Sequence, residues 1–361
     1  MLDQFYKDKK VLVTGHTGFK GAWLIIWLKE LGADIVGYSL DPLYENGLYN
    51  LSNISDSIID HREDLRDFPK LLEVFKKEKP EIVFHLGAQA LVIDGYNSPL
   101  ETFQTNTMGT ANVLEAIRLT DTVKTAIMVT TDKVYENKEW IWPYREEETI
   151  GGYDPYSASK GACELIISSY RNSFFNTNKY AEHGKAIASV RAGNVIGGGD
   201  WCDNRIVPDC IKSIEKNKEI EVRSPNAVRP WQHVLEPIGG YLYLGAKMIE
   251  DPISYSQAWN FGPENENIIT VSELVTKLIK SYGKGHWKDT SNSRNLHEAT
   301  LLSLDINKAK TNLNWSPVLG IDATIEYTTE WYKNYTHSNV LELTKDQIKN
   351  YVDLWKSKKE E

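Results

Sequence analysis

The chain has few cysteines, and none of them stands in a ligating pattern. Its 361 residues include three, Cys163, Cys202 and Cys210, an odd number without Cys-x-x-Cys spacing. The sequence therefore offers no basis for a disulfide scaffold or a thiolate metal site, and we expect a reducing compartment, the cytoplasm. His-Glu-x-x-His and comparable ligand spacings are also absent, so we expect no metal.

Long hydrophobic runs and an excess of basic charge are missing as well. The longest apolar run, Ala22 to Leu28, is far shorter than the roughly 20 residues of a membrane-spanning helix. Residues 1–10 are charged and lack an apolar core, so we expect no signal peptide. With 50 acidic and 41 basic residues the net charge is −9, which argues against nucleic acid or a membrane as a partner. A local basic pocket for a phosphorylated substrate is compatible with this balance.

The chain does contain a regular alternation of short apolar segments and longer segments with helical periodicity. Apolar runs bounded by glycine or polar residues are typical of strands buried on both faces. Strands separated by helices indicate a doubly wound, mostly parallel α/β sheet of the Rossmann type, with helices on both faces. The expected strands are 10–14, 34–38, 81–86, 125–131 and 186–191, and the expected helices are 18–31, 105–119 and 156–172.

This alternation ends near Arg191. Three consecutive glycines, 197–199, several prolines and scattered tryptophans follow. We interpret them as the start of a smaller, interleaved C-terminal substrate domain. The expected division is a Rossmann domain over 1–192 with 234–262, a substrate domain over 193–233 and 263–335, and a C-terminal helix over 336–361.

The C-terminal segment has an amphipathic pattern. Thr344-x-x-Gln347 is a capping-box pattern that predicts the start of a helix. We expect this helix to pack on its own subunit rather than to bind a partner. The apolar residues that follow at helical spacing are Ile348, Tyr351, Val352 and Trp355.

A glycine motif lies between the first expected strand and the first expected helix. Gly15, Gly18 and Gly21 have Gly-x-x-Gly-x-x-Gly spacing, unlike the Gly-x-Gly-x-x-Gly of simple dehydrogenases. Glycines permit positive φ and close approach of backbone N–H groups, and a helix N-terminus attracts anions. The motif therefore predicts a pyrophosphate site rather than a turn without ligand, with His16 shaping the loop. The predicted cofactor contacts here are Gly15, Thr17, Gly18, Phe19 and Gly21.

The end of the second expected strand indicates which dinucleotide binds. An acidic residue at this place would hold the ribose of NAD, but Ser39 occupies it and Asp41 follows two residues later. No arginine stands between 38 and 42 to hold a 2′-phosphate, so we predict NAD rather than NADP. Asp64 and Leu65, after the third strand, either bracket the adenine or form a plain surface loop.

Two further motifs carry titratable groups. Tyr156 and Lys160 lie four residues apart on an expected helix and therefore on one face. A phenol has a pKa of about 10, which a neighbouring ammonium and a cationic nicotinamide would lower, so the pair is a candidate base for an alcohol that loses hydride. Thr131, Asp132 and Lys133 stand at an expected strand end, where open α/β sheets bind ligands. They are candidate catalytic groups; the alternative is a solvated loop with cancelling charges.

Together these motifs resemble the extended short-chain dehydrogenase/reductase superfamily. The likeness includes Asn106 in the segment 105–110, and it implies that Ala88 and Asn106 also contact the cofactor. The acid at Asp132 is similar to that of the nucleotide-sugar 4,6-dehydratases, whereas epimerases of this fold usually lack it. The segments most similar to the branch of that family acting on CDP-glucose are 15–21, 131–137, 191–201, 229–234 and His297-Glu298-Ala299.

The resemblance implies a redox-neutral dehydration. Tyr156, assisted by Thr131 and Lys160, would take the proton of the sugar 4-hydroxyl while NAD⁺ receives the C4 hydride. The 4-ketone acidifies the C5 proton, whose loss, with that of the C6 hydroxyl protonated by Asp132, expels water. Return of the hydride to C6 gives CDP-4-keto-6-deoxyglucose, a precursor of dideoxy sugars in surface polysaccharide.

Lys133 departs from the family pattern, because the C5 base is usually a glutamate. A lysine with a pKa of about 10.4 is almost fully protonated at pH 7, and it acts as a base only if burial or nearby cations depress that pKa. Either Lys133 removes the C5 proton, or it stabilises the enolate while another group is the base.

The phosphates of a nucleotide sugar call for cations, and arginine offers bidentate recognition. By resemblance, Arg229 in the segment 229–234 holds the diphosphate. Asn194 and Arg205 are further substrate-binding candidates, while Arg294 is as readily a surface salt bridge. We expect His233 to be a satisfied structural histidine.

Other functions fit the same motifs. One alternative is a 4-epimerase or a dehydratase for another nucleotide sugar, since the residues alone do not separate CDP from dTDP, UDP and GDP. A non-catalytic NAD-sensing protein is disfavoured, because it has no need of Tyr156, Lys160 and Thr131 together. A homodimer or higher homo-oligomer is expected from symmetry and from the resemblance.

Overall fold

A seven-stranded parallel sheet forms the centre of the computed structural model, which describes residues 2–264, 268–291 and 301–360. The strand order is β3-β2-β1-β4-β5-β6-β11, and the predicted doubly wound Rossmann sheet is confirmed. Arg294 and the segment 297–299, named above, lie outside the described residues. The strands are β1 (Lys10–Thr14), β2 (Asp34–Ser39), β3 (Ile59–Arg62), β4 (Ile82–His85), β5 (Thr125–Val129), β6 (Ala186–Arg191) and β11 (Ala258–Asn260).

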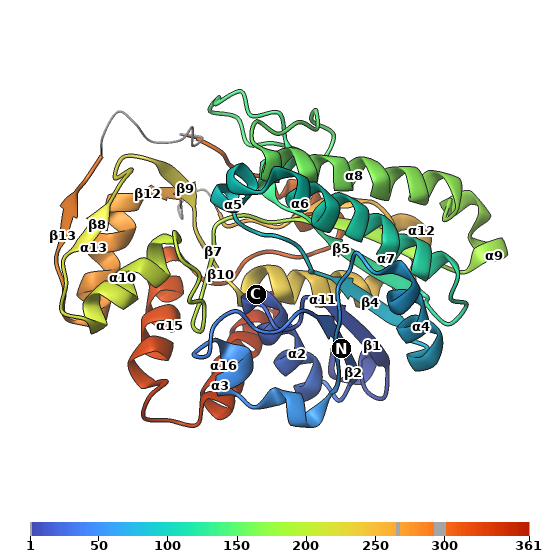
Figure 1. Cartoon of the computed structure of the whole chain (residues 1–361), viewed down its shortest axis with the longest axis horizontal. Helices are drawn as coiled ribbons and strands as arrows, with labels where there is room; N and C mark the ends of the chain where they lie inside the picture. Colours follow the sequence, from blue (N-terminus) through green and yellow to red (C-terminus); the bar gives the residue numbers. More distant parts are fainter. Residues whose placement is uncertain (1, 265–267, 292–300, 361) are drawn as a thin grey trace.

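Side chains that alternate along the strands divide the core into two layers. On β1, Val11 and Val13 pack on one face of the sheet and Leu12 on the other, and all three are fully buried. Strands covered on both faces need apolar residues at every position, which explains the continuous apolar runs in the sequence. No helix that the structure describes is long and apolar enough to cross a membrane. One face is covered by α4 (Phe68–Glu78), α7 (Gly109–Arg118) and α8 (Pro155–Ser173), the other by α2 (Phe19–Glu30), α11 (Leu235–Glu250) and α16 (Val340–Glu360) (Figure 1).

Beyond β6 the chain leaves the sheet, and it returns through α11 and β11. The smaller region is therefore interleaved with the Rossmann fold, as predicted, whereas the domain limits at 192, 233, 262 and 335 stay a prediction. Its paired strands are β7 (Val195–Ile196) with β10 (Gln232–His233), β9 (Val228–Pro230) with β12 (Ile268–Thr270), and β8 (Ile220–Val222) with β13 (Trp287–Asp289). Its longer helices are α10 (Ile206–Glu215), α13 (Val271–Tyr282) and α15 (Ile321–Asn334). The remaining elements are α1 (Leu2–Phe5), α3 (Leu48–Leu51), η1 (Ile54–Ser57), α5 (Val92–Asn97), α6 (Pro99–Phe103), η2 (Gln104–Met108), η3 (Asp132–Val134), η4 (Thr177–Lys179), α9 (Tyr180–His183), α12 (Pro252–Tyr255) and α14 (Asn307–Asn312).

Two elements expected within residues 1–192 differ from the structure by two residues or more at one end. The strand expected over 125–131 ends at Val129, because Thr131 instead caps the 3₁₀ turn η3, its hydroxyl accepting the N–H of Lys133 at 3.4 Å. The helix expected over 105–119 starts earlier, at Pro99, where proline suits the first helical position. It continues through the single π turn η2 into α7.

The C-terminal helix begins before the predicted capping box. α16 starts at Val340, so the prediction that Thr344 caps it is wrong. The side-chain oxygen of Asn339 accepts the backbone N–H groups of Leu341 and Glu342, at 3.0 and 3.2 Å. The Thr344 hydroxyl donates to the carbonyl of Val340 at 2.7 Å, within the helix, and α16 packs against α2 of the same chain.

A buried carboxylate joins α11 to the C-terminal region. One oxygen of Glu236 accepts the N–H groups of Val318 and Leu319, at 2.8 and 2.6 Å, and the other accepts the phenol of Tyr351 at 2.8 Å. Burial raises the pKa of Glu236 to about 7, against which its hydrogen bonds act. The folded chain therefore binds a proton here that the unfolded chain releases.

Replacing Glu236 by glutamine is predicted to flatten part of the pH dependence of stability. The Glu236 carboxyl contributes fully to the free energy of unfolding below its unfolded pKa of 4.5. This contribution is lost as the pH rises through about 7. Above that pH the loss is on the order of 3 kcal/mol, or roughly 5 °C in Tm. Thermal melts of parent and Glu236→Gln should diverge in favour of the variant between pH 5 and pH 8. Parallel pH profiles would contradict this assignment.

Candidate active site

One cleft lies at the carboxyl ends of the central strands. Its volume of about 1630 Å³ exceeds the roughly 300–1,000 Å³ of a typical single-ligand pocket, so it has room for two nucleotide-sized molecules. All but one of the predicted site residues line it. Those that do are Gly15, Thr17, Gly18, Phe19, Gly21, Asp64, Leu65, Ala88, Thr131, Asp132, Lys133, Tyr156, Lys160, Asn194, Arg205 and Arg229.

The glycine loop is built for close backbone approach. Gly15 has a φ of +72°, and a Cβ there would lie 2.6 Å from the backbone nitrogen of Gly87. A Cβ at Gly21 would lie 2.1 Å from the carbonyl oxygen of Gly15. The loop therefore requires glycines, and it delivers the N-terminus of α2 to the cleft. Unpaired N–H groups of a first helical turn suit a pyrophosphate, so these residues fit a dinucleotide.

Strand pairing brings an arginine next to the ribose position, which the local sequence did not reveal. Arg62 of β3 pairs with Ser39 of β2, and Ser39 hydrogen-bonds Thr17 at 2.9 Å. The guanidinium is held by Asp60, with Nη2 at 2.8 Å and Nε at 3.0 Å from the same oxygen. Because Asp60 compensates its charge, Arg62 is a weak candidate for a 2′-phosphate, and NAD stays the preferred cofactor.

Asn106 is the predicted site residue that does not line the cleft. It lies in the π turn η2 and is buried. Its side-chain oxygen accepts the N–H of Gln89 at 2.8 Å, and its amide donates to the Gln89 carbonyl at 3.0 Å and to Ser159 at 2.9 Å. Asn106 therefore holds the cleft loop around Gln89 against α8, and its contact with the cofactor stays a prediction.

The first turns of α8 place the tyrosine and the lysine. The Asp154 carboxylate caps the helix by accepting the N–H and hydroxyl of Ser157, at 3.0 and 2.6 Å. Tyr156 and Lys160 then face the cleft from one side of the helix. The Lys160 ammonium donates to the carbonyl of Val129 at 3.2 Å, at the end of β5.

Burial opposes the ionisation of Tyr156. It raises the pKa of the phenol to about 12, while a hydrogen bond with Thr131 and the charge of Arg205 act to lower it. The lowering expected from Lys160 and from a cationic nicotinamide stays a prediction. A cation bound beside the phenol would favour the phenolate.

Thr131 and Asp132 form a compact pair at the centre of the cleft. The Thr131 hydroxyl donates to one oxygen of Asp132 at 2.9 Å, and the Asn194 amide donates to the other at 3.3 Å. A Cβ at Gly193 would lie 1.9 Å from that second oxygen, so the carboxylate fills the space that glycine leaves. Lys133 follows in the same turn and is half-buried at the cleft.

The predicted phosphate-binding arginines lie farther along the cleft. Arg205 precedes α10, and its Nη1 donates to Asp200 at 2.9 Å. Arg229 is buried on β9, and its Nη1 donates to the carbonyl of Val228 at 2.9 Å. Both cations are thus held by backbone or carboxylate oxygens while their side chains line the cleft.

Lys20 is a cleft residue that the sequence analysis missed. It lies in the first turn of α2 and lines the cleft half-buried. Burial and the cations Arg205 and Lys160 lower its pKa to about 8, with Asp132 opposing them. The sequence did offer a signal for it, because Lys20 stands between Phe19 and Gly21, which were both predicted to contact the cofactor.

Neither His16 nor His233 lines the cleft. His233 is buried, and its Nδ1 accepts the N–H of Leu235 at 3.3 Å. Its Nε2 has no hydrogen-bond partner within the described part of the chain. We expect both ring nitrogens of a satisfied structural histidine to be hydrogen-bonded, and only one of them is. His16 is fully buried with Nε2 2.8 Å from Asp60. Across the described ranges, no group of three or more His, Cys, Asp or Glu could hold a metal ion.

Comparisons with known proteins identify the family of this chain. A family model described as GDP-mannose 4,6-dehydratase matches residues 12–328. A CDP-glucose 4,6-dehydratase from Salmonella typhimurium is 44% identical over 354 residues, which cover 98% of this chain and 99% of the relative.

Solved structures share the fold. A UDP-glucose 4-epimerase from Thermotoga maritima with UDP-glucose has a TM-score of 0.75 at 22% identity, covering 91% of this chain and 100% of the other. A dTDP-glucose 4,6-dehydratase from Bacillus anthracis in complex with NAD has a TM-score of 0.73 at 20% identity, covering 92% and 99%. The family match and the full-length relative together show that the chain belongs to the nucleotide-sugar 4,6-dehydratases of the extended short-chain dehydrogenase/reductase superfamily.

Proposed function

We propose that this enzyme is a hydro-lyase that converts CDP-D-glucose to CDP-4-keto-6-deoxy-D-glucose. The observation that carries the proposal is 44% identity along 98% of the chain to a CDP-glucose 4,6-dehydratase. The cleft supports it, because it gathers Tyr156, Thr131 and Asp132 around one space and places arginines farther along. The same relative supports CDP as the nucleotide.

NAD is the proposed cofactor. Gly15, Gly18 and the N-terminus of α2 would hold its pyrophosphate, and Ser39 would face its ribose, with Asp64 and Leu65 beside the adenine. When bound, NAD supplies the acceptor that takes hydrogen from sugar C4 and returns it to C6.

Tyr156 would take the proton of the sugar 4-hydroxyl. Its hydrogen bond with Thr131 and the charge of Arg205 favour the phenolate that accepts this proton. The ketone formed at C4 acidifies the proton on C5, and Lys133 either removes that proton or stabilises the enolate.

Asp132 would protonate the C6 hydroxyl, so that it leaves as water. It would first have to take up a proton, and the structure supports only its placement: Thr131 and Asn194 hold its two oxygens, and a Cβ at Gly193 would displace it. Arg205 and Arg229 would hold the diphosphate and so fix the distance of the sugar from these groups.

The reaction is tested by mass spectrometry without added cofactor. Purified protein is incubated separately with CDP-glucose and with dTDP-, UDP- and GDP-sugars. We expect a loss of about 18 Da, one water, with CDP-glucose and with none of the other sugars. No cofactor has to be added, because it is regenerated in each cycle. No mass change with any sugar, even after NAD⁺ is added, would contradict the dehydratase and favour an epimerase or a non-enzyme.

Asp132→Asn is predicted to separate oxidation from water loss. Loss of the proton donor should slow dehydration about 100-fold or more while C5 exchange continues. In D₂O, recovered CDP-glucose should gain deuterium without the loss of water. Gly193→Ala should act in the same way, because its Cβ would displace Asp132.

Gly262→Ala is the matched control for that experiment, since a Cβ there meets its nearest atoms at an ordinary 3.5 Å. It should keep the parent rate. Normal dehydration by Asp132→Asn would show that another group protonates the leaving hydroxyl.

We also propose that the enzyme is a homodimer or a higher homo-oligomer. Large apolar side chains are exposed on neighbouring helices, which supports an interface there. They are Leu100 (70% exposed) and Phe103 (38%) on α6, Met108 (54%) on η2 and Leu165 (63%) on α8.

Leu165→Glu is therefore predicted to reduce the molar mass in light scattering to that of one chain. Ile253→Glu, on α12 and 57% exposed, is the control and should leave the mass unchanged. A monomeric parent would overturn the proposed interface.

The cytoplasm is the proposed location. Cys163, Cys202 and Cys210 are all unpaired thiols, which supports a reducing environment. The ketone at C4 of the product prepares the sugar for further deoxygenation, and we therefore place the enzyme before dideoxy-sugar and lipopolysaccharide synthesis.

A further inference from the structure

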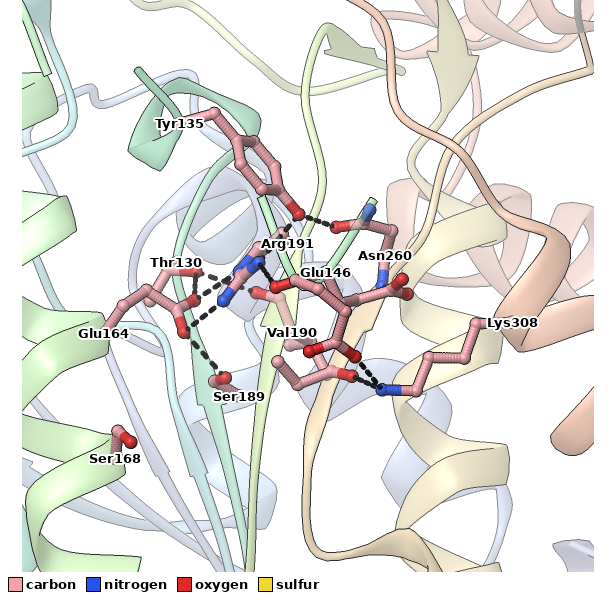
Figure 2. Close-up of polar contacts among 12 residues, drawn as sticks. Thr130, Tyr135, Glu146, Glu164, Ser168, Ser189, Val190, Arg191, Asn260 and Lys308 are labelled. Carbon is pink, nitrogen blue, oxygen red and sulfur yellow. Dashed lines mark hydrogen bonds and ion pairs between the residues drawn. The ribbon is translucent and has the colours of Figure 1, made fainter. Parts of the chain in front are cut away.

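A buried carboxylate lies one helical turn beyond Lys160. Glu164 of α8 is 4% exposed and accepts four hydrogen bonds (Figure 2). One oxygen accepts the hydroxyl of Thr130 at 2.5 Å and Nε of Arg191 at 3.0 Å. The other accepts the hydroxyl of Ser189 at 2.8 Å and Nη2 of Arg191 at 2.9 Å. This single side chain therefore joins α8 to the ends of β5 and β6.

The guanidinium of Arg191 extends the network to two more segments. Its Nη1 donates to the phenol of Tyr135 at 2.7 Å and to the carbonyl of Glu146 at 3.0 Å. The Tyr135 phenol donates to Asn260 of β11 at 2.7 Å. Figure 2 shows these groups converging on one guanidinium between the strand ends.

Three residues of the network lie close in the chain to residues of the cleft. Thr130 precedes Thr131, and Arg191 precedes the turn in which Gly193 packs against Asp132. Glu164 and Lys160 lie four apart on the same face of α8. Glu164 and Arg191 themselves do not line the cleft, so a substrate cannot touch them.

A gain in folding stability does not explain why the Glu164–Arg191 ion pair is buried. Burying two charges costs solvation, and apolar residues of similar volume are often as stabilising. A bidentate arginine–carboxylate pair is, however, geometrically specific, because its parallel hydrogen bonds set both distance and orientation.

We propose that Glu164 is a positioning residue that, through Thr130 and Arg191, holds Thr131, Asp132 and Lys160 in the arrangement required for proton transfer. The expected effect on kcat rests on the proposed dehydration. The expected effect on the arrangement of the side chains rests on the geometry alone. It assigns a role to charged side chains that lie outside the cleft.

Glu164 also acts on the charge of Lys160. Burial lowers the pKa of Lys160, and Cys163 and Glu164 act in the opposite direction. Loss of the Glu164 charge should therefore move the loss of the Lys160 proton, and the alkaline limb of kcat, to lower pH. The titratable and charged groups that face Lys160 are Cys163 and Glu164 on α8, His85 on β4 and Lys20 on α2.

The kinetic test compares the variants Glu164→Gln and Thr130→Val with the control Glu236→Gln, which alters a buried carboxylate of α11. The kcat and KM for CDP-glucose are measured across pH, below the onset of thermal unfolding of each variant. We expect Glu164→Gln to lower kcat about 100-fold with little change in KM, as a displacement near 1 Å would. Its alkaline limb should move to lower pH. Thr130→Val keeps the ion pair and should lower kcat by a smaller factor, and Glu236→Gln should leave kcat and KM unchanged.

Crystal structures of the parent and of both variants supply a readout that needs no substrate. In Glu164→Gln, the Lys160–Val129 bond of 3.2 Å and the Thr131–Asp132 bond of 2.9 Å should lengthen or break. If Glu164→Gln does not fold, Thr130→Val still tests whether the hydrogen bond between Thr130 and Glu164 positions Thr131. Unchanged bonds, or unchanged kcat per folded molecule in both variants, would overturn the positioning role. A parent without turnover would instead count against the proposed function, and the structures would still decide the inference.

Discussion

Parallel pairing of four strands is the constraint on which the whole cleft depends. The register places Thr14 of β1, His85 of β4, Met128 of β5 and Ser189 of β6 in one row across the sheet. The segments that follow these residues therefore start at the same edge. They carry the glycine loop, the loop around Gln89, the catalytic turn at Thr131 and the turn at Gly193. Residues separated by more than a hundred positions become neighbours because their strands end together.

Several cations line the cleft of this acidic protein. The chain has a net charge of −9, and the cleft contains Lys20, Lys133, Lys160, Arg205, Arg223 and Arg229 among its acidic side chains. Burial makes the charges of Lys20 and Lys160 costly, and it lowers the pKa of both. An anionic ligand beside these lysines offsets that cost, so this part of the cleft suits ligands that carry phosphates. A dinucleotide and a nucleotide sugar satisfy this requirement together.

Features with a local signal could be predicted from the sequence, and those created by long-range pairing could not. The glycine loop and the Tyr156–Lys160 face follow from strand and helix periodicity around a short motif. Arg62 reaches Ser39 only through the β2–β3 pairing, and Glu164 reaches Arg191 only through the packing of α8 on β6. Thr344 shows the opposite error: the spacing to Gln347 suggested a cap, but the side chain of Asn339 caps the helix, which starts at Val340. The bond between the Asn106 amide and Ser159 of α8 also depends on long-range packing, and nothing in the sequence indicated it.

One active site removes a hydride from C4 and returns it to C6 of the same sugar. The direct measurement uses CDP-glucose carrying deuterium at C4, mixed with an equal amount of substrate labelled with ¹³C only. We expect deuterium at C6 of product molecules that lack ¹³C. Deuterium in the ¹³C-labelled product, or its loss to water, would show that the hydride leaves the site and would contradict its return to the same sugar.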